Sequence, residues 1–303
     1  MINLKSVSKV FKSDLMTQPF AALDDVSFIV PEGAMVGFLG ANGAGKTTSL
    51  KIILDFIRPT AGEVSFARSM GETKMEILRN IGFLPERPYF YPSLSGKDFL
   101  KFMGKLSGMN NLEIQQEIDR WAIRFKINHA LDRELKTYSK GMLQRIGFLA
   151  AILHQPKLVI LDEPLSGLDP IGRKELKDVI IEVHKEGKTV FFSSHIVPDV
   201  QEICDRVIFL KEGKLVYDGP VDSLINSSGS TEYDAVVKMG ESPLPQSSYK
   251  QMIELPGNLK RYVIMESQKD EFLKTLLKNN DSIISLEPKR LSLEEVFYKT
   301  KDN

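Results

Sequence analysis

The segment Gly40-Ala-Asn-Gly-Ala-Gly-Lys-Thr47 decides the fold of this chain. It has the pattern GxxxxGK(S/T), and it stands between the apolar run Met35–Leu39 and a helical pattern over residues 48–56. In a strand, loop and helix of this kind, the glycines let backbone N–H groups wrap a polyphosphate, and the helix start adds its dipole. A flexible glycine-rich turn would have the same composition, but it would not bring the flanking strand and helix.

The pattern gives each residue of the loop a part in binding a nucleotide. Lys46 is expected to reach the β and γ phosphates, and the Thr47 hydroxyl is expected to ligate Mg²⁺. The residues predicted to bind the nucleotide are Gly40, Ala41, Asn42, Gly43, Ala44, Gly45, Lys46, Thr47 and Thr48. The expected ligands are therefore a nucleoside polyphosphate and Mg²⁺.

Two adjacent carboxylates, Asp162 and Glu163, end a second apolar run, Leu158–Leu161. A buried strand that ends in two negative charges needs a positive charge beside it, and Mg²⁺ supplies one. We expect Asp162 to hold the metal, directly or through water, and Glu163 to polarise an attacking water as general base. An acidic surface turn is the alternative, and the phosphate loop in the same chain argues against it.

The apolar runs at residues 35–39, 158–161 and 189–192 are each followed by a helical pattern. This alternation is typical of an α/β fold, in which buried parallel strands are joined by helices. Residues 95–153, between the first two runs, are rich in helical pattern and predict a helical subdomain with Trp121 in its core.

A small polar linker around Ser227–Ser230 predicts a boundary between a large domain, residues 1–226, and a small α+β domain, residues 230–303. The small domain is expected to hold a hairpin near residues 256–258 and a last helix with a capping box at Ser292 and Glu295. An assembly or regulatory role and a purely structural role both fit it.

Composition excludes several classes of protein. The chain has 40 basic and 40 acidic residues among its 303, so no net positive field draws it to nucleic acid. Cys204 is the only cysteine and is expected to be a buried structural thiol, since it leaves no partner for a disulfide within the chain. The start lacks the apolar core of a signal peptide and the chain lacks a membrane-spanning run, which favours a cytoplasmic protein.

Three further motifs follow in a fixed order. The segment Tyr138-Ser-Lys-Gly-Met-Leu-Gln-Arg145 resembles the signature of ATP-binding cassette (ABC) proteins, which is commonly LSGGQ. Ser166-Gly-Leu-Asp169 resembles the D-loop of that family, and Ser194-His195 resembles its switch histidine. Residues 1–225 therefore resemble an ABC ATPase, which implies ATP as the nucleotide and a P-loop α/β fold with an antiparallel β subdomain and a helical signature subdomain.

The resemblance implies that two such subunits, in the simplest case two copies of this chain, stack head to tail and trap two ATP molecules. Ser139 and Gly141 would contact the γ-phosphate from across the interface. His195 would sense the γ-phosphate and hold the attacking water, and Asp169 would link the two sites. Together with Lys46, Glu163 and His195 form the expected catalytic set.

Two positions near the nucleotide depart from the usual pattern. Phe11 resembles the aromatic residue that stacks on adenine, but the chain between it and the phosphate loop is longer than is usual, and Phe20 is the alternative. Glu86 stands where the family has the glutamine of the Q-loop. A carboxylate at this position can face Mg²⁺ more strongly than an amide, so Glu86 is a predicted metal-facing residue.

The signature itself also departs from the common form, with Tyr138, Lys140 and Met142 in place of Leu, Gly and Gln. These changes, with the segment Ser292–Phe297, resemble the ATPases of drug, polyketide and polysaccharide exporters. In that branch the permease is usually a separate chain. We expect it to dock near the loop Phe83–Pro92, and we expect the chain to lie peripherally on the inner face of the cell membrane.

Tyr89, Phe90 and Tyr91 in that loop are expected permease contacts, with local packing as the alternative. A soluble ABC ATPase that works on ribosomes or DNA is the competing function. Such proteins usually carry two cassettes or a long coiled coil, which this sequence lacks, and it has no basic stripe. A nucleotide-regulated protein without turnover would lack the catalytic glutamate, and Glu163 is present.

Overall fold

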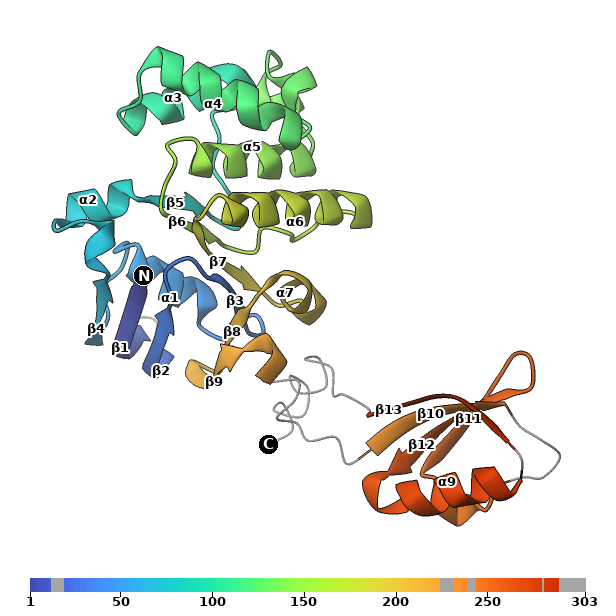
Figure 1. The fold of residues 1–303 in the computed structure, drawn as a ribbon. Helices are drawn as coiled ribbons and strands as arrows, with labels where there is room; N and C mark the ends of the chain where they lie inside the picture. Colours follow the sequence, from blue (N-terminus) through green and yellow to red (C-terminus); the bar gives the residue numbers. More distant parts are fainter. Residues whose placement is uncertain (12–18, 224–231, 239–243, 280, 289–303) are drawn as a thin grey trace. The chain divides into compact units, whose positions relative to one another are not determined.

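The computed structural model describes residues 1–11, 19–223, 232–238, 244–279 and 281–288. The chain divides into two compact units, Met1–Val221 and Asp222–Asn303 (Figure 1). The linker predicted around residues 227–230 and the last helix predicted at 292–297 lie outside the described residues. The domain limits 226 and 230 stay a prediction, and each unit is described by itself.

A six-stranded sheet organises the first unit, in the order β5-β6-β7-β3-β8-β9. Its strands are β3 (Met35–Leu39), β5 (Ile81–Leu84), β6 (Leu158–Leu161), β7 (Thr189–Ser194), β8 (Arg206–Lys211) and β9 (Lys214–Pro220). All neighbours pair in parallel except β8 and β9, which form an antiparallel edge. The three predicted apolar runs are β3, β6 and β7, and every residue of these strands is buried, as parallel strands covered on both faces require.

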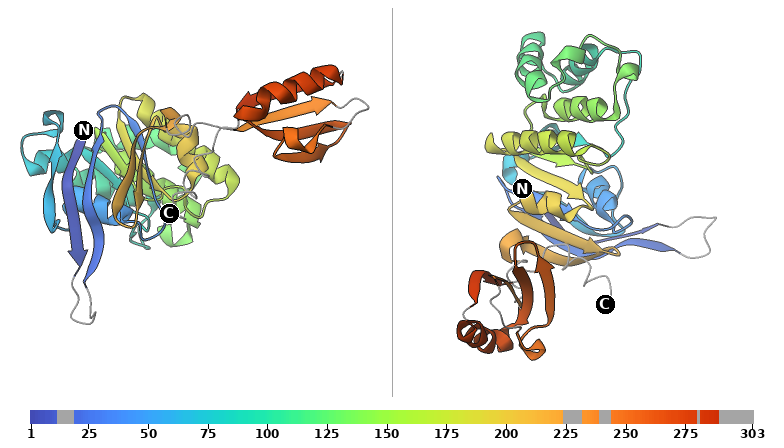
Figure 2. Two further views of the ribbon diagram at one scale, coloured as in Figure 1. Left: turned by 90° about the horizontal axis from the view of Figure 1, so that it is seen from below. Right: turned by 90° about the vertical axis from the view of Figure 1, so that its right-hand side faces the viewer.

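A second sheet, of antiparallel strands, packs on the first. It has the order β2-β1-β4, with β1 (Ile2–Phe11), β2 (Phe20–Val30) and β4 (Ala61–Phe66), and β1 and β2 run side by side (Figure 2). One core joins the two sheets. At its centre the ring of Phe38 lies 5.5 Å from that of Phe28 and 5.1 Å from that of Phe191. The predicted antiparallel β subdomain is thereby confirmed.

The helices of the first unit connect these strands. The helix after the phosphate loop is α1 (Lys46–Ile53), and it begins two residues before the predicted pattern because Lys46 and Thr47 are already helical. The others around the sheet are α2 (Lys74–Arg79), α6 (Pro170–Lys185) and α7 (Val197–Ile203). Cys204 follows α7 and is buried, and burial raises the pKa of its thiol well above the usual range.

The helical subdomain consists mainly of α3 (Gly96–Leu106), α4 (Asn111–Arg124) and α5 (Lys140–Ile152). Trp121 lies in its core, 1% exposed, and its indole N–H donates to Glu117. The helix α5, which carries the signature, also packs against β5 and β6, so it joins the subdomain to the central sheet (Figure 1).

The second unit is a small α+β structure. Its antiparallel sheet has the order β11-β12-β10-β13, with β10 (Glu232–Lys238), β11 (Gln251–Leu255), β12 (Leu259–Met265) and β13 (Ser282–Pro288). The helix α9 (Lys269–Lys278) covers one face and buries Phe272 against Tyr262. The predicted hairpin is the turn between β11 and β12. Among the described residues of either unit, no helix has the length and apolar character that a membrane crossing needs.

Candidate functional site

The phosphate loop connects β3 to α1 in a conformation that only glycine adopts without strain. Gly43 and Gly45 have φ angles of +84° and +105°. A Cβ on Gly45 would also lie 2.7 Å from the Ala22 carbonyl oxygen, so the loop has no room for a side chain there. Lys46 is buried, and its ammonium donates to the carbonyl oxygens of Gly40 at 2.6 Å and Ala41 at 3.3 Å.

Asp162 is held by hydroxyl donors from two neighbouring elements. Thr47 Oγ1, on α1, donates to Oδ2 at 3.2 Å, and Ser193 Oγ, at the end of β7, donates to Oδ1 at 2.6 Å. Burial raises the pKa of the Asp162 carboxyl. The two hydroxyls oppose that rise, and the nearby carboxylates of Glu163 and Glu86 add to it. Because burial and nearby negative charge both oppose ionisation of this carboxyl, a cation beside it would stabilise the ionised form.

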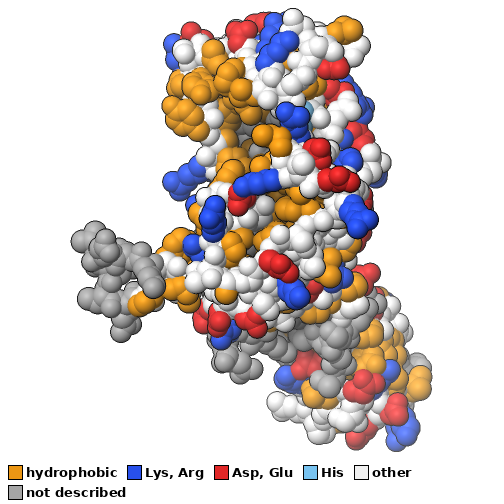
Figure 3. Space-filling view, turned by 90° about the vertical axis from the view of Figure 1, so that its left-hand side faces the viewer, with side chains coloured by type: hydrophobic (Ala, Val, Ile, Leu, Met, Phe, Trp, Pro, Cys, Tyr) orange, Lys and Arg blue, Asp and Glu red, His pale blue; other side chains and the backbone are white. Residues whose placement is uncertain are grey.

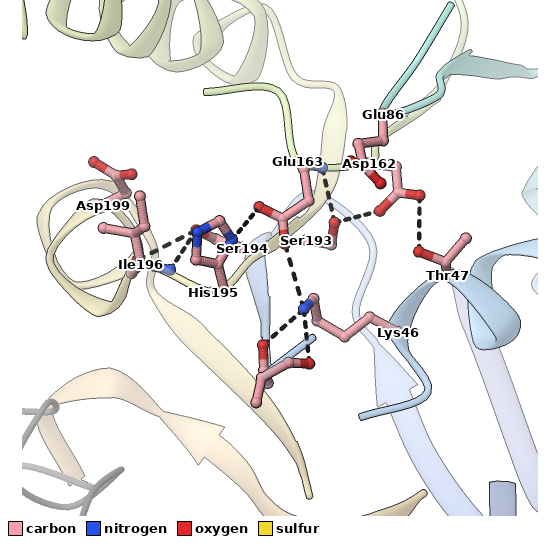
Figure 4. A network of polar contacts seen from close by, with 12 residues as sticks. Lys46, Thr47, Glu86, Asp162, Glu163, Ser193, Ser194, His195, Ile196 and Asp199 are labelled. Atoms are coloured by element: carbon pink, nitrogen blue, oxygen red, sulfur yellow. Dashed lines mark hydrogen bonds and ion pairs between the residues drawn. The ribbon is translucent and has the colours of Figure 1, made fainter. Parts of the chain in front are cut away.

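Glu163 lies between the ammonium of Lys46 and the imidazole of His195 (Figure 4). Its Oε2 is 2.8 Å from His195 Nδ1, and its Oε1 is 3.3 Å from Lys46 Nζ and makes no hydrogen bond among the described residues. The backbone at Glu163 has φ +49°, which is strained for a residue with a side chain, and its N–H donates to Ser193 Oγ at 2.8 Å. The strained turn aims the carboxylate toward the phosphate loop.

Lys46, Thr47, Glu163 and His195 line one cavity of about 420 Å³. The residues around it are Phe20, Ala22, Asn42, Gly43, Gly45, Lys46, Thr47, Thr48, Glu86, Glu163, Ser166 and His195. The phosphate loop, the catalytic candidates and Glu86 are far apart in the sequence. They meet at the carboxyl ends of parallel strands, where open α/β sheets bind ligands.

Phe11 and Phe20 are direct partners across β1 and β2, so their rings lie on the same face of that sheet. Phe20 is 55% exposed and lines the cavity. Phe11 is not among the lining residues, and its ring instead lies 5.1 Å from the ammonium of Lys9. The geometry therefore favours Phe20, the alternative, over Phe11 as the residue beside a base.

The residues predicted from the signature and from the end of the D-loop are not among the described residues that line the cavity of their own chain. Ser139 caps α5 by accepting from the Met142 N–H at 3.2 Å, and Gly141 lies in the first turn of that helix. Asp169 caps α6 by accepting from the Gly172 N–H at 2.9 Å. A single chain therefore presents the phosphate loop and the signature as separate surfaces.

Ser193 is a site residue to which the sequence analysis assigned no role. It accepts from the Glu163 backbone and donates to Asp162, so one hydroxyl ties the two carboxylate residues to the end of β7. The only signal in the sequence is the pair of serines before His195.

The oxygen donors beside the phosphate loop suit Mg²⁺. No group of three or more His, Cys, Asp or Glu side chains with metal-binding geometry occurs in the part of the chain that the structure describes. Around the phosphate loop, however, a hydroxyl and two carboxylates supply oxygen only, and Asp162 needs a cation. This set fits Mg²⁺, which prefers one or two carboxylates, water and the phosphates of a substrate.

Known proteins are similar to this chain in sequence. The family model described as "ABC transporter" matches residues 23–166. An uncharacterised ABC transporter ATP-binding protein of Nostoc sp. is 34% identical over 303 residues, which cover 98% of this chain and 88% of the relative. The bacitracin transport ATP-binding protein BcrA of Bacillus licheniformis is 33% identical, with 97% of each chain covered.

Solved structures share the fold. One described as the ATP-binding subunit of an ABC transporter has a TM-score of 0.66 and 28% identity, and the match covers 76% of this chain and 93% of that one. A dimeric post-hydrolysis state of the ATP-binding cassette MJ0796, bound to ADP and Pi, has a TM-score of 0.65 at 23% identity, over 73% of this chain and 98% of that one. The predicted fold class is confirmed.

Ser193→Ala tests the arrangement around Asp162. The change removes a hydrogen bond that lowers the pKa of Asp162, so the pKa rises further and the ionised form is lost at a higher pH than in the wild type. We expect Mg²⁺-dependent binding of a fluorescent ATP analogue to weaken about tenfold on the acidic side, since a hydrogen bond to a charged group contributes about 1.5 kcal/mol.

The matched control is Ser194→Ala, because the Ser194 hydroxyl contacts Ile196 and not Asp162. Titrations from acid to neutral pH compare the two variants with the wild type. Identical acidic limbs in all three proteins would show that Ser193 does not set the ionisation of Asp162.

Proposed function

Because this chain belongs to the family of ABC transporter ATP-binding proteins, we propose that it is the ATP-hydrolysing subunit that drives a separate membrane permease. Family membership makes it an ATP-binding subunit with the ABC ATPase fold. The observation that carries the proposal is the position of Glu163. Its carboxylate lies between Lys46 and His195 at the mouth of the phosphate loop.

Within the chain, Lys46 is satisfied by loop carbonyls and by Glu163. The phosphates of ATP are stronger partners for this ammonium than neutral carbonyl groups are. When Lys46 turns to them, Glu163 loses its ammonium partner and its Oε1 is free to accept a proton from water. His195, which stays on Oε2, then fixes the direction of the carboxylate, so Glu163 acts as general base.

Thr47 and Asp162 are the residues that would hold Mg²⁺, with Glu86 on the same side of the cavity. The metal, when bound, offsets the negative charge that develops on the transferred phosphoryl group. Phe20, with Phe11 behind it on the next strand, offers a ring on which adenine stacks.

The site is completed by a second subunit in this proposal. Ser139 and Gly141 lie at the start of α5, where the helix dipole favours a negative group, yet neither lines the cavity of its own chain. Two chains stacked head to tail place each signature over the other chain's nucleotide and bring Asp169 to the interface. We propose a homodimer, since one chain carries both halves of the site.

An apolar groove lies beside the Q-loop and suits the permease. Its volume is about 630 Å³, and Phe83, Tyr89, Phe90, Tyr91 and Phe102 line it together with residues of α2, α3 and α5. Tyr89 is 82% exposed and Tyr91 48% exposed. Figure 3 shows hydrophobic side chains along a hollow of this face, with Lys and Arg around it. An apolar helix of a permease fits such a groove, and the chain would then lie on the inner face of the membrane.

We propose outward transport. The signature form Tyr138-Ser-Lys-Gly-Met142 resembles that of exporter ATPases, and a relative that covers nearly the whole chain is named as a bacitracin transport protein. The balance of charge supports the absence of a nucleic-acid partner.

Glu163→Gln tests the proposed function. Removing the general base lowers the ATPase rate at least about 100-fold but leaves the phosphate loop intact, so ATP binds and is not consumed. We expect the wild-type rate per subunit to rise with protein concentration, and the variant to form a dimer on size exclusion in ATP. A flat wild-type rate together with an active, monomeric variant would contradict both the base and the paired site.

Tyr89→Ser with Tyr91→Ser tests the groove. Loss of two exposed aromatic rings weakens binding to an apolar partner about tenfold or more. The measurement is the fraction of the chain that sediments with membrane vesicles of its own cells, beside ATP binding by the purified variant. Ile29→Ser, which removes an exposed side chain of β2, is the control. Equal sedimentation of both variants, with normal ATP binding, would place the permease elsewhere.

Glu86→Gln tests the metal-facing role. A neutral amide binds a cation less strongly than a carboxylate, so the Mg²⁺ concentration that gives half of the maximal ATPase rate rises about fivefold. Glu63→Gln, an exposed change on β4, is the control. A lower Mg²⁺ requirement would mean that Glu86 acts only by repelling Asp162, and an unchanged one would remove it from the site.

A further inference from the structure

A second cluster of charged side chains lies outside the nucleotide cavity, between α6 and α7. Asp199, in the first turn of α7, is 3% exposed. Its Oδ2 lies 3.8 Å from Arg173 Nη1 and its Oδ1 lies 3.7 Å from Lys177 Nζ, and both cations belong to α6. Lys177 also pairs with Glu202. Two carboxylates of α7, of which Asp199 is the buried one, thus join this helix to α6.

The cluster is imperfectly satisfied. Asp199 Oδ2 and Arg173 Nε make no hydrogen bond among the described residues, although both atoms are buried. Burial raises the pKa of Asp199, and the two cations oppose that rise. Buried ion pairs seldom add to stability beyond what apolar packing would give, because their desolvation is costly. A role in positioning is therefore the better explanation of this one.

Both helices begin at the functional segments. The helix α7 starts two residues after His195, and the turn between them is fixed by the Ile196 N–H, which donates to Ser194 Oγ at 2.9 Å (Figure 4). The helix α6 starts at Asp169, which caps it. A shift of the His195 segment is therefore resisted by α6, and with it by the D-loop.

The helix α6 carries a second ionic junction, on its other side. Glu175 pairs with Arg145 of the signature helix α5 and accepts from Lys126 Nζ at 2.7 Å. Arg145 also donates to the Phe125 carbonyl at 3.0 Å. Residues two apart on a helix point about 200° apart, so Glu175 faces away from Arg173 and Lys177. The helix therefore lies between the His195 segment and the signature.

We infer that Asp199 is a positioning residue. Through Arg173 and Lys177 it couples α6 to the His195 segment, so that the two move together. Glu175 couples α6 in turn to the signature helix. The inference rests on the proposed function, since the signature serves the other subunit. The nucleotide at one site then sets where the chain presents its signature to the second site. The two ATP sites communicate through α6 within each chain.

Asp199→Asn and Glu175→Gln test the inference in a Glu163→Gln background, where ATP holds the dimer without being hydrolysed. Both changes keep the shape of the side chain and remove one charge of a junction, and Asp199→Asn leaves only the more exposed pair of Lys177 with Glu202 between α6 and α7. We expect each to weaken the ATP-bound dimer about fivefold or more by sedimentation. ATP binding at concentrations where the chain is monomeric stays unchanged, because neither residue lines the cavity.

Joining the two changes gives the decisive comparison. If α6 acts as one bridge, breaking either junction already uncouples it, so the combined variant is weakened by less than the product of the separate effects. Asp218→Asn is the control, since it breaks the ion pair with Arg206 between β8 and β9, which does not touch α6. It lowers the thermal stability and leaves the dimer as tight as before.

An unchanged dimer in Asp199→Asn would overturn the inference, and so would effects that multiply in the combined variant. Equal weakening by Asp218→Asn would show that any lost ion pair has this result, and it would overturn the inference as well. A Glu163→Gln chain that stays monomeric in ATP gives a different result, because it removes the proposed function itself.

Discussion

The site depends on a carboxylate that must be ionised where burial opposes ionisation. Asp162 follows β6, whose residues are all buried, and its pKa is raised by that burial. The neighbouring elements supply the compensation. The strand β7 brings the hydroxyl of Ser193 and α1 brings that of Thr47, and their hydrogen bonds oppose a rise in pKa to which the nearby carboxylate of Glu86 adds. The strands β5, β6 and β7 are neighbours in the sheet, so polar groups at or just after their ends come close to one carboxylate.

Most of the fold could be predicted from local sequence patterns. The apolar runs at residues 35–39, 158–161 and 189–192 could be recognised as buried strands because burial on both faces demands continuous apolar sequence. The phosphate loop could be recognised because its glycines adopt the positive φ angles that this loop requires, and that requirement is local to the loop. The positions of the loop, of Glu163 and of His195 around one cavity follow from where parallel strands end.

The contacts that could not be predicted are those set by register and by backbone strain. Ser193 reaches Asp162 because Leu161 pairs with Phe192, one residue earlier on each strand, and no feature of either strand states that register. The aromatic residue at the cavity is Phe20 rather than Phe11 for a similar reason. The left-handed turn at Glu163 occurs in a residue that seldom adopts it, so composition gives no sign of it.

Two of the unusual signature residues, Tyr138 and Lys140, are accommodated by glycines elsewhere in the chain. Tyr138 is buried and donates to the Ala130 carbonyl at 2.6 Å, and a Cβ on Gly96 would lie 2.2 Å from its hydroxyl, so this tyrosine needs a glycine there. Lys140 lies against Gly167 of the D-loop. Neither change alters the cap that Ser139 provides to α5.

The separation of loop and signature within one chain has a consequence for the cell under the proposed dimer. A subunit made in excess of its permease is dilute, so it binds ATP without hydrolysing it. Two subunits docked on one permease are confined together, and their effective concentration rises far above that in the surrounding fluid. The permease would then activate the ATPase, and ATP would be hydrolysed only by subunits that are docked on a transporter.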